Sequence, residues 1–192
     1  MSAGLIVFLV ITGFLVVGLI GYFITIYNGL VRLRRNLKRN WSNIDVLLKQ
    51  RHDELPKLVS VCEGYMKYER ETLEKITSLR STYLGARTVG EKSRVEGELA
   101  GALKTLFAVV EKYPDLKADQ RFAQLQERIS FLENQIADRR ELYNESANIY
   151  NIRINQIPDK FVASSCNFTV EELLKVAEAE RKDVKIQFNF PK

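Results

Sequence analysis

The sequence predicts an all-α protein in which an N-terminal transmembrane helix continues into a long antiparallel helical bundle, with a short C-terminal strand or tail. Three observations support this prediction. An uncharged apolar run lies near the amino end, apolar residues recur every three or four positions over long stretches, and the 192 residues include only 10 Gly and 4 Pro. Such spacing is typical of helices with one buried face, and so few glycines and prolines disfavour a loop-rich or β-sandwich fold.

The apolar run covers residues 5–26 and contains no charged residue. As a helix its 22 residues would be about 33 Å long, and the hydrocarbon core of a bilayer is about 30 Å thick. In lipid such a segment must be helical, because each backbone N–H needs a partner within the segment. The residues before it lack the Lys or Arg of a signal peptide, and Thr25-Ile26-Tyr27 is a poor cleavage site. We expect a short tail over 1–4 and an uncleaved anchor over 5–27.

A block of positive charge follows the anchor and equals the net charge of +5. Because basic residues beside a span tend to stay in the cytoplasm, we expect the N-terminus to face outward and the domain over 41–192 to be cytoplasmic. The juxtamembrane segment 28–40 should attract anionic lipid headgroups by about 1 kcal/mol per basic residue. No basic face extends over the domain, so a nucleic-acid partner is not expected. The expected lipid contacts are Arg32, Arg34, Arg35, Lys38 and Arg39.

The anchor helix is expected to continue through Asn28-Gly29 into the first helix of the bundle. From Ile44 to Tyr83 mostly apolar residues follow a spacing of four and three, which predicts one helix with an apolar seam. Pro56 lies inside it and predicts a kink, because proline removes one helical hydrogen bond.

Two further helices follow a turn over 85–90. The first should run from about Glu91 to Tyr113, and the second from about Asp119 to Ile157. A helix of that length, about 57 Å, needs another long helix beside it, which predicts antiparallel packing against the first.

The C-terminal part is expected to contain a loop, a short helix and a strand. Residues 159–168 are interpreted as the loop. Thr169-Val-Glu-Glu172 has the pattern of a capping box and predicts a helix to about Arg181. Alternating apolar residues over 184–190 predict a strand, whose edge could pair with that of another copy.

No residue pattern indicates an enzyme, a cofactor or a metal site. The chain has one histidine, His52, and its two cysteines, Cys62 and Cys166, are far apart. Nucleotide-binding and nucleophile-elbow motifs are absent from the sequence, and Cys62 lies in the apolar seam as a buried thiol would.

Polar residues at seam positions are the candidate functional residues. Arg51 could pair with Asn144 or Asn148, and Glu69 with Arg139; alternatively, these positions are partly exposed. Four asparagines at a spacing of four and three could bond within the bundle, between subunits or, as a third possibility, to a ligand. The full set is Arg51, Glu69, Arg139, Asn144, Asn148, Asn151 and Asn155.

Short motifs spread over nearly the whole chain resemble the bacterial LemA family. The resemblance implies a membrane-anchored antiparallel helical domain at the bacterial inner membrane, with no enzymatic activity, and a similar magnetosome-associated relative suggests membrane organisation by analogy. The motifs are Tyr27–Val31, Trp41–Arg51, Pro56–Val59, Tyr113–Ala118, Phe122–Gln126 and Glu133–Ala137, followed by Arg139, Tyr143-Asn144, Tyr150-Asn151, Ile157-Pro158 and Phe168.

These features favour a non-enzymatic membrane-anchored scaffold that forms homo-oligomers or organises partners. An adapter or regulator of another membrane protein, such as a sensor or a protease, is the main alternative. A ligand-binding module that uses the asparagine row is the third.

Overall fold

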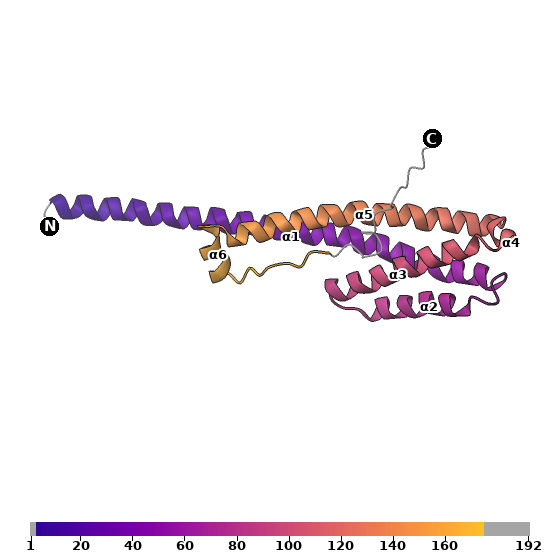
Figure 1. Cartoon of the computed structure of the whole chain (residues 1–192). Helices are drawn as coiled ribbons and strands as arrows, with labels where there is room; N and C mark the ends of the chain where they lie inside the picture. The colour runs from indigo at the N-terminus through magenta and orange to yellow at the C-terminus, as the bar shows by residue number, and fades with distance from the viewer. Residues whose placement is uncertain (1–2, 175–192) are drawn as a thin grey trace, which may run out of the picture. The chain divides into compact units, whose positions relative to one another are not determined.

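The computed structural model describes residues 3–174, which form six helices and no strand (Figure 1). The all-α prediction is therefore confirmed, whereas the strand expected over 184–190 lies outside the described residues. The chain divides into two compact units: an anchor unit of residues 3–44 and 139–173, and a bundle unit of residues 45–138 and 174. The helices are α1 (Ala3–Glu63), α2 (Arg70–Gly85), α3 (Val89–Val110), α4 (Pro114–Lys117), α5 (Gln120–Asn155) and α6 (Asp159–Ser165).

Helix α1 contains the apolar run and continues without a break through Asn28-Gly29, as predicted. Residues 3–25 of this helix, which include nearly all of the apolar run, are exposed. Among the described residues, α1 is the one helix that is long and apolar enough to cross a membrane. It also continues through Pro56, so that proline does not end the helix, and the kink stays a prediction.

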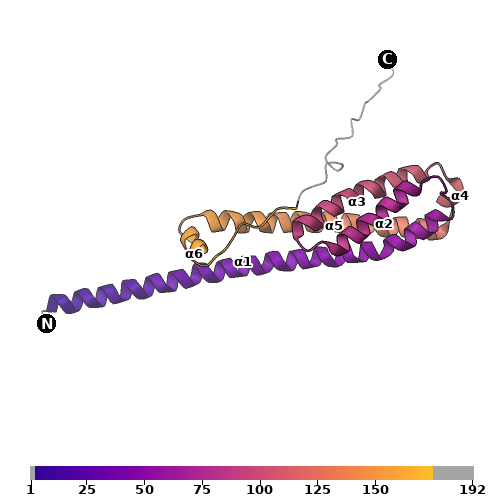
Figure 2. The ribbon, with the colours of Figure 1, turned by 90° about the horizontal axis from the view of Figure 1, so that it is seen from below.

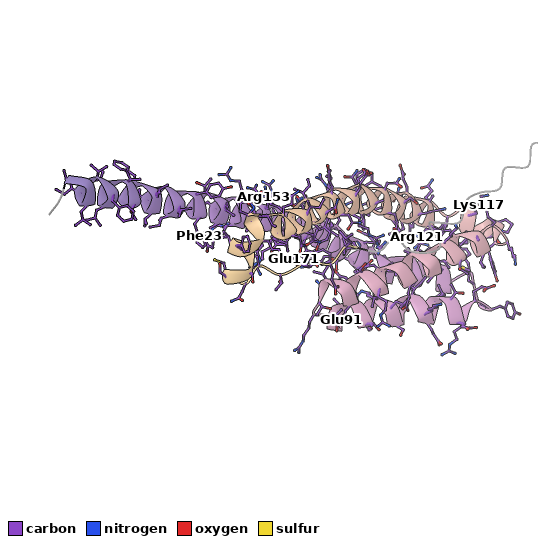
Figure 3. The ribbon with its side chains drawn as sticks, turned by 60° about the vertical axis from the view of Figure 1, so that its left-hand side comes forward. Phe23, Glu91, Lys117, Arg121, Arg153 and Glu171 are labelled. Atoms are coloured by element: carbon purple, nitrogen blue, oxygen red, sulfur yellow. The ribbon has the colours of Figure 1, made fainter. Side chains whose placement is uncertain are left out.

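In the anchor unit, α1 begins to bury one face at the end of the apolar run. Phe23, labelled in Figure 3, is still exposed, whereas Ile26 and Leu30 are buried. The carboxyl half of α5 packs antiparallel to this part of α1. The side-chain amide of Asn40 donates to Ser146 Oγ at 2.7 Å.

One glycine of α1 lies beneath a side chain of α5 near the end of the apolar run. A Cβ atom on Gly29 would lie 3.0 Å from the Arg153 guanidinium. Arg153 is labelled in Figure 3 and pairs with Asp159, at the start of α6, at 2.7 Å. The missing side chain at position 29 therefore leaves room for the Arg153 side chain over α1.

The bundle unit contains the end of α1, the helices α2 to α4 and the first half of α5. Figures 1 and 2 show α2 and α3 side by side. Side chains from these helices form a closed apolar core, since burying an apolar stripe is what makes such helices stable. Its fully buried members include Leu55, Leu58, Ile76, Leu99, Leu106, Ile129 and Leu132.

The single helix predicted up to Tyr83 is wrong, because the chain turns over residues 64–69. The backbone amides of Tyr65 and Met66 both donate to the Cys62 carbonyl, at 3.0 and 2.8 Å. Met66 is buried in this turn. The apolar spacing continued across the break because α1 and α2 both bury a stripe in the same unit.

The C-terminal predictions for 159–174 are also wrong. Residues 159–165 form α6 where a loop was expected, and residues 169–174 are not helical where a capped helix was expected. The rest of that expected helix, residues 175–181, lies outside the described residues. The capping box lies instead at the start of α3. There Thr88 Oγ1 accepts from the Glu91 amide at 3.1 Å, and the Glu91 carboxylate accepts from the Thr88 amide at 3.1 Å. Glu91 is labelled in Figure 3.

The Thr88→Ala substitution should lower the free energy of unfolding by about 1 kcal/mol, because the first turn of α3 loses its side-chain acceptor. Urea unfolding of the full-length chain in mild detergent, followed by circular dichroism, measures this change. Thr82→Ala is the matched control: Thr82 is exposed within α2, and its hydroxyl only donates back to Ser78 O. Equal effects of the two substitutions would contradict the capping role.

Candidate functional site

Three groups of polar residues are candidates for a functional site, and the first is the basic block after the apolar run. Arg32, Arg35, Lys38 and Arg39 are exposed on α1, as lipid contacts would need to be. Arg34 is only partly exposed, because its guanidinium lies 5.8 Å from the centre of the Phe168 ring.

The second group is the polar face of α5 in the anchor unit, and it holds residues 169–172 as an extended segment that we call the strap. The Asn151 side chain donates to the Glu171 carbonyl at 2.8 Å and accepts from the Glu171 amide at 2.9 Å. The hydroxyl groups of Tyr150 and Tyr143 donate to the carbonyls of Thr169 and Glu172. Burial raises the pKa of both tyrosines, so they stay protonated donors at neutral pH.

The strap explains why the predicted helix does not form at Thr169. The first backbone amides of a helix must be free to bond a capping group, and its carbonyls must be free to accept from the amides of the next turn. Here side chains of α5 already bond the carbonyl of Thr169 and both backbone groups of Glu171, and these bonds are compatible with extended backbone. Figure 3 labels Glu171 on this segment.

The rest of the asparagine row has different surroundings from Asn151. Asn144 is partly buried, Asn148 is exposed, and Asn155 is exposed and donates to the Asn151 carbonyl at 2.8 Å. Asn151 is therefore the member of the row whose side chain bonds the strap within the described residues. That contact depends on where the strap lies, and helical spacing along α5 does not predict the position of the strap.

The third group lies in the bundle unit around Arg51, which is fully buried on α1. Its guanidinium forms ion pairs with Glu96 on α3 and Glu133 on α5. Sequence reasoning missed both carboxylates and considered asparagines instead. The sequence does indicate that Glu96 is buried, since it stands three residues before Leu99 on the apolar side of its helix. Because an unpaired buried charge is strongly destabilising, this cluster fixes how the three helices meet within the unit.

The histidine belongs to the same cluster. His52 Nε2 lies 2.6 Å from Glu96 Oε1, and the ring stacks on Tyr83 with 3.9 Å between centres. Burial lowers the pKa of His52 to about 3, and the neighbouring positive charges, of which that of Arg51 has the largest effect, act in the same direction. At neutral pH the ring is therefore uncharged and donates its Nε2–H to the carboxylate.

The remaining predicted seam residues lie outside this cluster. Glu69 precedes α2 and is partly exposed, and Arg139 is exposed on α5. Within residues 3–174, no group of three or more His, Cys, Asp or Glu side chains is arranged to hold a metal ion. Burial raises the pKa of the Cys62 thiol to about 12, so this thiol stays protonated and unreactive.

An apolar N-terminal helix of spanning length, followed by packed helices whose buried charges are paired, defines a membrane-associated helical protein. The chain belongs to the LemA family: the family model matches residues 40–188. Protein LemA of Metamycoplasma hominis is 33% identical over 174 residues, which cover 86% of this chain and 78% of the relative.

Magnetosome proteins are more distant relatives. Magnetosome protein MamQ 2 of Paramagnetospirillum magneticum is 24% identical over 186 residues, 83% of this chain and 68% of the relative. Magnetosome protein MamQ of Magnetospirillum gryphiswaldense is 24% identical over 182 residues, 80% of this chain and 67% of the relative. None of these names denotes an enzyme.

The Asn151→Ala substitution should release the strap, because it removes both hydrogen bonds to Glu171. Two such bonds contribute about 2 kcal/mol, so the Glu171 amide should exchange with solvent at least about tenfold faster. Hydrogen–deuterium exchange of the full-length chain measures this. Asn148→Ala is the control from the same row, and unchanged exchange at Glu171 in Asn151→Ala would contradict the contact.

Lowering the pH from 7 to 5 should destabilise the native protein more than the His52→Phe variant. The pKa of His52 is 6.5 in the unfolded chain and about 3 in the fold. The unfolded state therefore binds the extra proton, and stability present above pH 6.5 is lost as the pH falls toward 3. The part due to His52 is about 2 kcal/mol at pH 5.

Urea unfolding at both pH values measures this difference. Phenylalanine keeps a ring that can stack on Tyr83 but does not titrate, so the variant isolates the histidine from other groups. An identical pH dependence of the two proteins would show that the fold does not lower the pKa of His52.

Proposed function

We propose that this chain is a non-enzymatic, membrane-anchored helical scaffold that self-assembles at the inner membrane, with its helical domain in the cytoplasm. The observation that carries the proposal is the continuity of α1. Its buried face begins at Ile26, the last residue of the apolar run, and the helix continues to Glu63. Packing therefore begins at the membrane surface without a linker, which suits a scaffold better than a flexibly tethered enzyme.

An apolar stripe on α5 supports self-association. Leu142, Ile149 and Ile152 are 45%, 48% and 48% exposed, and their spacing of seven and three places them on one side of the helix. We assign a second copy of the chain to this stripe. An anchor confines all copies to one plane, which raises their effective concentration, and a single stripe can pair with itself across a two-fold axis.

The charge distribution and the relatives support the rest of the proposal. The five basic residues over 32–39 favour a cytoplasmic domain. Two relatives are named as magnetosome proteins, which by analogy alone favours a structural role over a catalytic one. Asn151 holds the chain's own backbone, so the asparagine row offers less to a ligand than the ligand-binding alternative requires.

Chemical cross-linking of the full-length chain in native membranes tests the assembly. The native chain and the control Val46→Gln/Leu84→Gln should form cross-linked oligomers. Ile149→Gln/Ile152→Gln should lose most of them, because the stripe no longer gains by leaving water. The control removes two apolar residues outside the stripe, Val46 and Leu84, which are 54% and 65% exposed and thus at least as exposed as those of the stripe.

Two results would overturn the proposal. A native chain that stays monomeric in membranes would exclude self-assembly, and a stoichiometric second membrane protein in the same sample would favour the adapter alternative. Equal loss of oligomers in both double variants would exclude the stripe as the interface.

A further inference from the structure

A pocket of about 230 Å³ lies in the anchor unit, directly after the apolar run. Residues of α1 form one side, and the segment after α6 forms the other. The lining includes Tyr27, Arg34, Arg35, Lys38, Cys166 and Phe168. Of the five basic residues after the anchor, three line this pocket, whereas Arg32 and Arg39 do not.

The pocket combines positive charge with an aromatic wall. The Tyr27 and Phe168 rings meet edge to face, with 5.8 Å between their centres. Arg34 Nε is buried and has no hydrogen-bond partner among the described residues. The carboxylate of Glu171 is 3.9 Å from this nitrogen, beyond hydrogen-bond distance. One negative charge therefore faces three positive ones, which leaves the pocket with an unbalanced preference for an anion.

The place of the pocket along α1 determines which anion can reach it. Tyr27 directly follows the apolar run, and Arg34 and Arg35 follow about 10–12 Å further along the helix axis. Helical side chains lean toward the amino end, here toward the bilayer, and long basic side chains extend to the headgroup layer. With the apolar run in the hydrocarbon, the guanidinium groups would reach the depth of lipid phosphates, and the aromatic rings would lie near the boundary of the hydrocarbon.

We propose that this pocket binds the phosphate of one anionic phospholipid from the leaflet in which α1 ends. The proposal deepens the membrane-surface role above and rests on the anchor crossing a bilayer. It differs from a diffuse attraction of the whole basic block, because it assigns the phosphate to Arg34, Arg35 and Lys38 and excludes Arg32 and Arg39. The aromatic wall would cover the glycerol end of the same lipid.

The two native cysteines provide a direct measurement. Cys166 lines the pocket and is partly exposed, whereas Cys62 is fully buried. In the full-length chain in detergent micelles, maleimide should therefore react at Cys166, and its rate should fall when the pocket is occupied. Phosphatidylglycerol, phosphatidylcholine and inorganic phosphate are the three probes to titrate.

Two double variants remove the same charge from the same block. Arg35→Gln/Lys38→Gln changes two exposed residues of the pocket, and Arg32→Gln/Arg39→Gln changes two exposed residues outside it. Arg34 is kept because it packs on Phe168. Phosphatidylglycerol should slow the labelling of Cys166 in the native chain and in the control variant. The half-protecting concentration should rise about 30-fold in the pocket variant, as expected for the loss of two basic contacts.

Each contrary result has a distinct meaning. Equal shifts in both double variants would overturn the pocket in favour of diffuse attraction. Equal protection by phosphatidylcholine would exclude selection of an anionic lipid, and equal protection by inorganic phosphate would identify a free-anion site instead. Because these measurements use dispersed chains, their outcome does not depend on self-assembly. A failed cross-linking test with intact lipid protection would therefore reject the scaffold alone.

Discussion

Within the hydrocarbon of a bilayer, every backbone N–H and C=O must be satisfied inside its own segment, and helix α1 meets this requirement and then continues into the protein. At Ile26 the helix begins to bury one face against the protein, while its backbone stays helical. The next buried side chains, Leu30 and Leu37, follow on the same helix. The end of α5, the α6 helix and the strap all pack around this short stretch, so the organisation of the anchor unit depends on α1 staying helical there.

A second theme is the pairing of buried polar groups. In the bundle unit, Arg51 and Glu96 leave water together, and each would be costly without the other. In the anchor unit, the strap has no neighbouring strand among residues 3–174, and side chains of α5 supply partners for its backbone at Glu171. Polar side chains thus hold together elements that apolar contacts alone would leave free to slide.

Periodicity was enough to predict the main helices. Helices α3 and α5 begin and end within three residues of the predicted bounds. The turn at Met66 was not predicted, because the apolar spacing continues on both sides of it. The capping pattern was ambiguous: Thr88-Val-Gly-Glu91 and Thr169-Val-Glu-Glu172 both match it, yet only the first caps a helix. At Thr169 the tertiary partners on α5 bond the backbone instead, and no local pattern contains that information.

The sequence by itself determined the apolar span, the basic block that follows it and the helical class. These properties depend on residues close together in the chain, such as the uncharged run over 5–26. Only the tertiary structure decided which polar residues meet. Arg51 and Glu133 are 82 positions apart, and their pairing depends on which faces of two helices come together. Periodicity along one helix identifies its buried face, but the partner of a charge on that face lies on another helix.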